Sequence, residues 1–232
     1  MFSPKDAALE RGWPGRIEGN RVIQLAAQTL QAFFTGGGGA REHAEYPLEE
    51  VELRAPVLFP PSFRVFSAFE AGGPRFEFGN TAAVGGPEEQ IHAPKGSSHL
   101  DFGLALAAMI GADGEVGGFT VANTWAARDL PDAKSRDFAT SIGPVLVTPD
   151  EFPGDTGTIV ARVNGEERSR ANLSGLAYGW PELVAYAALN TRLRPGDLIL
   201  AEATGGNRPP LRPGDLVELE VAGIGVLRNS VR

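Results

Sequence analysis

His99 and Asp101 are the residues whose types and spacing come nearest to a metal site. Residues two apart in an extended strand project from the same face, so this imidazole and this carboxylate would point the same way. A complete site would need two further ligands, which Glu70 and Glu77 could supply. The spacing of these four residues matches no established metal motif, so the pattern alone does not predict a metal centre.

Nucleophilic catalysis has little support in the sequence. The chain has no cysteine, which removes thiol chemistry, disulfides and thiolate metal ligands. Ser67 has no histidine close to it in the sequence that could activate its hydroxyl group. His43 and His92 fall in expected loops, where we expect exposed side chains. No catalytic residue is therefore assigned from the sequence.

Composition and charge narrow the classes of protein that this chain can represent. Its 232 residues, 42% of them hydrophobic, suit one moderately large domain or a domain with a small appendage. The formal net charge of −8 argues against nucleic acid as a partner, because binding to phosphates needs a basic surface. No apolar run approaches the roughly 18 residues of a membrane span, and no signal peptide follows Met1. A cytoplasmic protein is expected.

Strands and turns dominate the expected secondary structure, since glycine (30) and proline (18) are abundant. Residues 1–50 are expected to form a small region of their own. Its turn at Gly19-Asn20 predicts a hairpin between 15–18 and 21–23, followed by a helix over 22–34. Residues 51–232 predict the larger domain, with an Asn164-Gly165 hairpin turn and one clear helix over 181–189. The fold class is α+β, mainly β.

Several segments, taken together and in order, resemble the fumarylacetoacetate hydrolase (FAH) family, in particular its bacterial branch. The matching segments are 60–64, 68–70, 100–102, 118–123, 125–129, 137–144, 148–151, 163–165, 194–197 and 223–229. The resemblance implies a β-rich catalytic domain behind a small N-terminal domain, a dimer, and an active site among loops. It also implies cleavage or rearrangement of carbon–carbon bonds beside carbonyl groups in oxo acids, assisted by Mg²⁺ or Ca²⁺.

The carboxylates that would bind this cation are missing. Hard divalent cations take oxygen ligands, mainly carboxylates, and the resemblance implies four such positions. Here these positions hold Val65, Gly103, Ala105 and Thr124. Asp101, Gly103 and Ala105 are expected on one face of a strand, where two carboxylates would otherwise grip the ion. We therefore expect no metal and no other cofactor.

The catalytic base implied by the resemblance is also missing. The position of the family's histidine falls on Gly72, and a glycine cannot accept a proton from water. The middle of a Thr-Gly-Thr segment near the end of the family's sequences is occupied by Glu202, within Ala201-Glu202-Ala203. The loops that would cover the site also look shortened, after Gly72 and after Pro131.

Three polar residues remain in register with the family's substrate side. Lys134 falls on a lysine position of the family, and Arg128 and Asn123 also match. Together they could form a recess for a carboxylate or enolate oxygen. Alternatively, Arg128 and Asp129 form a structural ion pair and Asn123 satisfies backbone groups.

Three functional interpretations follow. The first is a non-hydrolytic pseudoenzyme that binds a small carbonyl or oxo-acid ligand or a protein partner, most simply as a homodimer. The second is a metal-independent enzyme that tautomerises, cyclises or otherwise rearranges a carbonyl compound by positioning and electrostatics. The third is an oxo-acid hydrolase or decarboxylase with a rebuilt metal site. The identity of the ligand and the pathway stay open.

Overall fold

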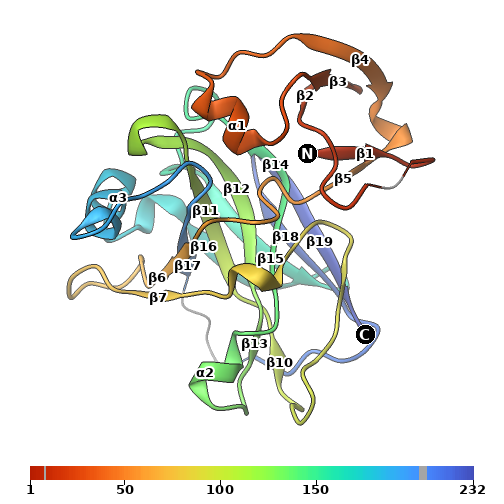
Figure 1. Cartoon of the computed structure of the whole chain (residues 1–232). Coiled ribbons are helices and arrows are strands. Elements are labelled where there is room, and N and C mark those ends of the chain that lie inside the picture. Colours follow the sequence, from red (N-terminus) through yellow and green to blue (C-terminus); the bar gives the residue numbers. More distant parts are fainter. Residues whose placement is uncertain (8, 204–207) are drawn as a thin grey trace.

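A seven-stranded sheet forms the centre of the molecule. The computed structural model describes residues 1–7, 9–203 and 208–232 (Figure 1). The strands of this sheet run in the order β7-β6-β17-β11-β12-β14-β8. They are β6 (Phe63–Phe66), β7 (Phe76–Phe78), β8 (Val84–Gly85), β11 (Leu104–Ile110), β12 (Val116–Thr124), β14 (Thr140–Val147) and β17 (Leu198–Ala203).

A second, five-stranded sheet packs against the first in the order β16-β15-β18-β19-β9. Its strands are β9 (Gln90–Ile91), β15 (Thr158–Val163), β16 (Glu166–Asn172), β18 (Leu216–Val221) and β19 (Gly225–Val231). Alternate residues of β11, including Leu104 and Leu106, join Ile159 and Leu219 of the second sheet in the largest hydrophobic core. Both faces of β11 are buried, which explains its continuous apolar sequence. The expected fold, mainly β, is confirmed.

The first 53 residues form two small β arrangements. β2 (Gly15–Glu18), β3 (Arg21–Leu25) and β4 (Glu42–Pro47) make a three-stranded sheet, and β1 (Phe2–Pro4) pairs with β5 (Val51–Leu53). The hairpin predicted at Gly19-Asn20 is confirmed. The helix predicted over 22–34 is wrong in its first half, because the β-branched Val22 and Ile23 are buried in β3. Only α1 (Leu30–Thr35) is helical, and the Thr29 hydroxyl caps it.

Short helices and turns complete the fold. The helices are α2 (Asp132–Ser135) and α3 (Trp180–Ala188), with 3₁₀ turns η1 (Leu48–Glu50), η2 (Thr81–Ala83), η3 (Ala112–Gly114) and η4 (Leu173–Gly175). α3 lies one residue before the predicted bounds. The turn between β15 and β16 falls at Asn164-Gly165 as predicted, with both residues at positive φ. No helix among the described residues is long and apolar enough to cross a membrane.

The chain changes sheet at Phe102-Gly103. β10 (Leu100–Asp101) pairs with β13 (Ala126–Ala127) in a separate two-stranded sheet, and only from Leu104 onward does the chain enter the central sheet. The expectation that Asp101 shares a strand face with Gly103 and Ala105 is therefore wrong. A short interruption of two residues gives no signal in the alternation of side chains, so the sequence could not reveal it.

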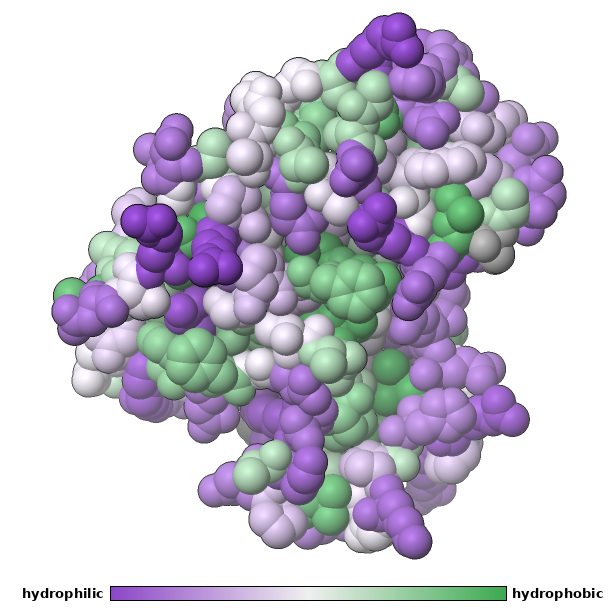
Figure 2. Space-filling model, in the orientation of Figure 1, coloured by the Kyte–Doolittle hydropathy of each residue, from purple (hydrophilic) through white to green (hydrophobic). Residues whose placement is uncertain are grey.

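Apolar side chains reach the surface over the middle of one face, where hydrophilic residues surround them (Figure 2). The large hydrophobic residues that are exposed within the described part of the chain are Ile17, Phe59, Phe78, Tyr186 and Leu189. Phe78, at 69% exposure, lies at the candidate site described next.

Candidate active site

Residues from five neighbouring strands form a row across one face of the central sheet. Val65 of β6 lies opposite Glu77 of β7, and Ala105 of β11 lies opposite Glu202 of β17. Thr124 of β12 shares the face of Ala105, since their register partners differ by two residues. Gly103 precedes β11 and accepts the Thr124 backbone N–H at 3.3 Å. The four positions implied for metal carboxylates thus do gather in space, although none carries a carboxylate.

The space beside Gly103 is filled by other side chains. A Cβ atom placed on Gly103 would lie 1.9 Å from Oγ1 of Thr124 and 2.6 Å from Oε1 of Glu202. A side chain at position 103 would therefore require these groups to shift, and the Thr124 carbonyl oxygen, also 2.6 Å away, belongs to the backbone. Thr124 and Glu202 therefore occupy the volume into which an aspartate or glutamate at position 103 would project.

An ion pair lies at the centre of this row. Nη1 of Arg136, which directly follows α2, lies 2.6 Å from Oε2 of Glu202. The Thr124 hydroxyl donates to Oε1 of the same carboxylate at 3.0 Å. The side chain of Arg136 is 30% exposed, and that of Glu202 is 13% exposed. Nε and Nη2 of Arg136 have no hydrogen bond within the described residues, so they can donate to a ligand.

Opposing influences act on the pKa of Arg136. Partial burial is the largest and lowers the pKa, but the charge and hydrogen bond of Glu202, with the more distant charges of Glu77 and Asp101, outweigh it. The pKa of the guanidinium is therefore raised above its ordinary value. Arg136 places a permanent positive charge on the face where the resemblance implies a metal cation.

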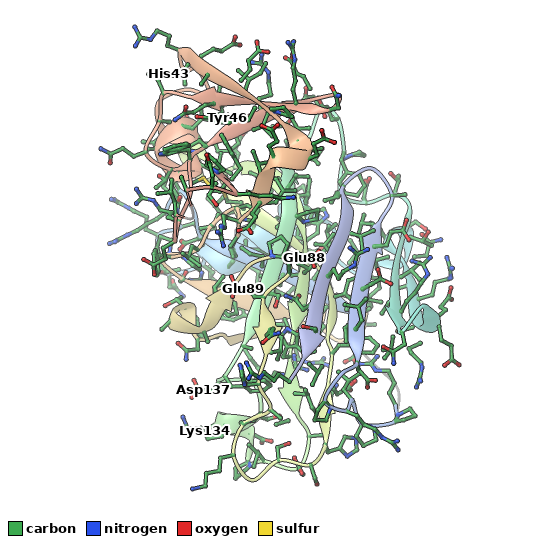
Figure 3. The ribbon with its side chains drawn as sticks, turned by 90° about the vertical axis from the view of Figure 1, so that its right-hand side faces the viewer. His43, Tyr46, Glu88, Glu89, Lys134 and Asp137 are labelled. Carbon is green, nitrogen blue, oxygen red and sulfur yellow. The ribbon has the colours of Figure 1, made fainter. Side chains whose placement is uncertain are left out.

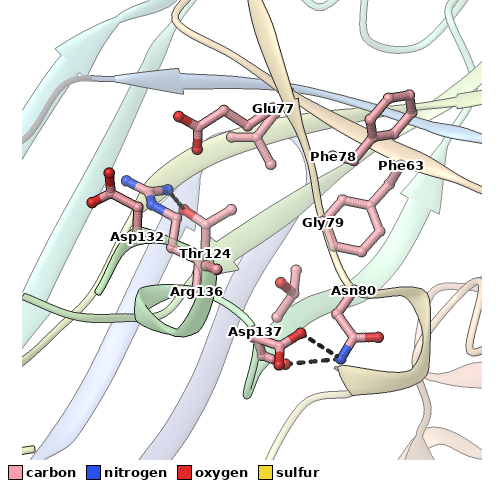
Figure 4. Close-up of a pocket in the computed structure, with 12 residues that line it drawn as sticks. Phe63, Glu77, Phe78, Gly79, Asn80, Thr124, Asp132, Arg136 and Asp137 are labelled. Carbon is pink, nitrogen blue, oxygen red and sulfur yellow. Dashed lines mark hydrogen bonds between the residues drawn. The ribbon is translucent and has the colours of Figure 1, made fainter. Parts of the chain in front are cut away.

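A cavity of about 130 Å³ opens beside this ion pair. Phe63, Val65 and Phe78 line its apolar side, and Glu77, Thr124 and Arg136 are among the residues of its polar side (Figure 4). Asn80, whose amide donates to Asp137, helps to close the end near α2. The elements β6, β7, β12 and α2 therefore enclose a space for a small organic molecule, with one charged donor at its wall.

The side chains present here do not fit a divalent cation. Among the described residues, no three His, Asp or Glu side chains gather as potential metal ligands. The carboxylate of Glu202 is already neutralised by Arg136, whose charge would repel a metal ion. Asp101, a ligand of the rebuilt site considered from the sequence, instead binds Arg128 and Arg208. The set His99, Asp101, Glu70 and Glu77 does not assemble.

The three residues predicted from the sequence to bind substrate are not among those that line this cavity. Lys134 is 69% exposed and pairs with Asp137, at the end of the molecule opposite His43 (Figure 3). Arg128 lies 3.0 Å from a carboxylate oxygen of Asp101. Asn123 is buried, and its side-chain oxygen accepts the Gly103 N–H at 3.0 Å. The roles of these three residues as substrate ligands stay predictions.

Two further expectations can be placed in the structure. Asp129 does not pair with Arg128; its carboxylate accepts hydrogen bonds from Ser97 and Ser98. Gly72 lies in a loop at φ +121°, and a Cβ atom there would have no neighbour within 4 Å. The position of the missing histidine is therefore open, and nothing in the described structure fills it.

Sequence reasoning missed Arg136 and did not assign a role to Glu202. Arg136 lies two residues after Lys134 and directly before the matching segment 137–144, and its side chain is less exposed than that of Lys134. Glu202 was easier to recognise from the sequence, because it places a charge where the resemblance implies a glycine in a buried strand. A partner of opposite charge was therefore required, but its identity depends on the path of the chain through α2.

A family model described as fumarylacetoacetate (FAA) hydrolase C-terminal matches residues 66–232. The chain belongs to the fumarylacetoacetate hydrolase family. This match covers the two packed sheets and the candidate site, except for the part of β6 that contains Phe63 and Val65.

Individual relatives agree with the family assignment. The chain is 36% identical over 173 residues to an uncharacterized protein of Methanocaldococcus jannaschii, covering 66% of this chain and 70% of that protein. It is 32% identical over 176 residues to the mitochondrial oxaloacetate tautomerase FAHD2A of Bos taurus, covering 65% of this chain and 56% of the relative. This match thus spans little more than half of the tautomerase.

A solved structure shows the same fold over nearly the whole chain. The 5-carboxymethyl-2-hydroxymuconate delta-isomerase of Mycobacterium smegmatis superposes with a TM-score of 0.83, covering 99% of this chain and 97% of the isomerase. Its sequence identity is 23%, so this likeness establishes the fold alone.

Proposed function

We propose that this protein is a metal-independent enzyme that promotes tautomerisation or isomerisation of a small carbonyl compound. The observation that carries the proposal is the Arg136 guanidinium, held by Glu202 and Thr124 beside a cavity, with no described residue bonded to its Nε and Nη2 donors. The name of the bovine tautomerase supports an enzyme of this kind over a pseudoenzyme.

Arg136 has the properties needed to stabilise an enolate. Removal of a proton next to a carbonyl group places negative charge on the carbonyl oxygen, and a fixed donor aimed at this oxygen lowers the barrier. Glu202 and Thr124 fix the guanidinium before substrate binds, so little reorganisation is required. The raised pKa keeps Arg136 charged at every physiological pH.

Glu77 is the carboxylate available for proton transfer. It lines the same cavity from β7, is exposed, and forms no ion pair or hydrogen bond within the described residues. Its carboxylate removes a proton from the carbon next to the carbonyl, and the electrons of the broken C–H bond form a C=C bond. The carbonyl oxygen becomes the enolate oxygen, which Arg136 stabilises. Protonated Glu77 then returns the proton to that oxygen or to another carbon of the conjugated system.

The charges around the cavity bear on the class of substrate. Asp132 and Glu77 have no ion-pair partner within the described residues, whereas Asp137 is neutralised by Lys134. With Arg136 paired to Glu202, these carboxylates leave an excess of negative charge that disfavours dianionic oxo acids. The aromatic wall favours an apolar substituent. A neutral or singly charged carbonyl compound fits this cavity best.

A spectrophotometric assay in the presence of EDTA tests the proposal. Enol–keto interconversion is followed by ultraviolet absorbance for oxaloacetate and for its uncharged diethyl ester, with and without the protein. We expect acceleration in EDTA, with the ester preferred. Glu77→Gln and Arg136→Met should each lower kcat/KM by about 10²–10³-fold, whereas the exposed control Arg16→Ala should not.

Two outcomes would contradict the proposal. The first is no acceleration for either compound or for a wider panel of enolisable ketones. This result would favour the interpretation of the protein as a pseudoenzyme. The second is activity that disappears with EDTA and returns with Mg²⁺, because the proposed chemistry needs no cation.

A further inference from the structure

We infer that a second cavity, separate from the candidate active site, binds a small doubly charged oxyanion, such as a phosphate group or a dicarboxylate. This cavity has a volume of about 310 Å³ and shares no lining residue with the first. Three arginines line it, one from β16 and two from the segment before β18, together with one aspartate and apolar residues. Its lining includes Phe102, Arg168, Arg208, Arg212 and Asp215.

Arg208 forms the buried wall of the cavity. Its side chain is only 8% exposed, and its guanidinium stacks on the ring of Phe102 at 4.1 Å from the ring centroid. Nε donates to Asp101 at 3.0 Å, and Nη2 donates to the Phe102 carbonyl oxygen at 2.5 Å. Nη1 is buried and has no hydrogen-bond partner among the residues that the structure describes. A buried donor without a partner is costly, so the site retains unused capacity to bind an acceptor.

The charge around Arg208 is not balanced by protein carboxylates. Asp101 accepts from both Arg208 and Arg128, so two guanidinium groups share one buried carboxylate. One positive charge is therefore left over beside the cavity. This local excess stands out in a chain whose formal net charge is −8.

The other two arginines bring two more positive charges to the cavity, which the carboxylates of Glu166 and Asp215 offset. Arg212 forms no ion pair within the described residues. Asp215, the carboxylate of the cavity, accepts from the Arg212 backbone N–H and from the Asn164 side chain. Arg168 contacts Glu166 at 3.2 Å, but this glutamate is 73% exposed, and such surface pairs contribute little. The side chains of Arg168 and Arg212 can therefore turn toward a ligand without breaking a strong interaction.

Guanidinium groups at several sides of one cavity favour an oxyanion. Arginine presents its donors in a planar fork that matches carboxylate and phosphate oxygens. A ligand with two charges would engage Arg168 and Arg212 at the mouth while the fixed charge of Arg208 lies behind it. A polyanion such as nucleic acid is disfavoured, since the rest of the chain is acidic.

Titration with inorganic phosphate tests this inference. Binding is followed by the Nε–H resonances of the arginines at constant ionic strength, with sodium chloride as the balancing salt. We expect saturable shifts of the Arg168 and Arg212 signals. Arg168→Ala and Arg212→Ala should each weaken phosphate binding at least fivefold. Arg170→Ala is the matched control, because it removes the same charge from the same strand, where Arg170 pairs with Glu167 outside the cavity.

A parallel titration with succinate distinguishes a site for phosphate groups from a site for dicarboxylates. Saturable binding of phosphate, succinate or both supports an oxyanion site, and the tighter ligand identifies its class. The inference is overturned if neither anion shifts these signals more than chloride does. It is also overturned if Arg170→Ala weakens binding as much as Arg212→Ala, because the effect would then reflect net charge alone.

Discussion

Nη1 of Arg136 and Oε2 of Glu202 are 2.6 Å apart on the sheet face where the family resemblance implies a divalent cation. Under the proposed function, the guanidinium of Arg136 and one carboxylate stand where the resemblance implies an exchangeable cation and its carboxylates. A guanidinium supplies positive charge for an enolate oxygen, but it cannot activate water as a metal ion does. This difference favours proton transfer over hydrolysis.

Restoring a carboxylate at one metal position should not restore a metal site. In Gly103→Asp, the new Cβ atom would collide with Thr124 and Glu202. We expect a loss of about 1–3 kcal/mol in the free energy of unfolding, unchanged by millimolar Mg²⁺. Urea denaturation with and without Mg²⁺ measures both effects. Gly175→Asp is the control, because a Cβ atom there has no neighbour within 4 Å; stabilisation of Gly103→Asp by Mg²⁺ would refute the expectation.

Neutralising Glu202 should leave Arg136 without its ion-pair partner. We expect Glu202→Gln to lower the free energy of unfolding by about 1.5–3 kcal/mol, the value of a hydrogen bond to a charged group. Arg136→Met should lower the free energy of unfolding less in the Glu202→Gln variant than in the wild type, because the two residues are coupled. A double-mutant cycle by urea denaturation gives the coupling energy, and additive effects would show that the pair does not act as a unit.

Gly79 allows Phe63 to line the cavity. A Cβ atom at Gly79 would lie 1.7 Å from the Phe63 ring, which is buried. Gly79→Ala should therefore displace this ring, reduce the volume of the cavity, and destabilise the fold by about 1–3 kcal/mol. Thermal unfolding and the KM of any substrate found report these two effects. Gly39→Ala, in open space, should change neither.

Asp129 should make the stability of the fold depend on pH in the acid range. The hydroxyl of Ser97 and the backbone N–H of Ser98 donate to its carboxylate and lower its pKa from 3.8 to about 2. A carboxyl group with a lowered pKa in the folded state stabilises the fold above pH 3.8, and this contribution is lost as the pH falls toward 2.

The variant Asp129→Asn isolates this contribution, since its side chain does not titrate. The wild type should be more stable than Asp129→Asn at pH 5, and the difference should shrink steadily as the pH falls below 3.8. Urea denaturation across this range measures the difference. A gap that stays constant with pH would show that the carboxylate charge does not matter.

Local sequence signals determined much of the architecture. The Gly19-Asn20 and Asn164-Gly165 turns were predictable because few residue pairs tolerate the backbone of a tight hairpin. The ordered family segments correctly indicated a mainly β fold, and Val65, Ala105 and Thr124 lie on one face of the central sheet, on the side to which a Cβ atom of Gly103 would project. Each of these inferences depends on residues close together in the sequence or on a pattern that the whole family shares.

The partners of the charged residues were decided only by the tertiary structure. Arg136 and Glu202 are 66 residues apart, and Arg208 and Asp101 are 107 apart. Their contacts depend on strand order, on the interruption at Phe102-Gly103 and on the path of the chain through α2. Charge attraction acts between any acid and base that the fold brings together, so the sequence can show that Glu202 needs a partner but cannot name Arg136. The residue types set the available chemistry, and the packing of the sheets selected which groups meet.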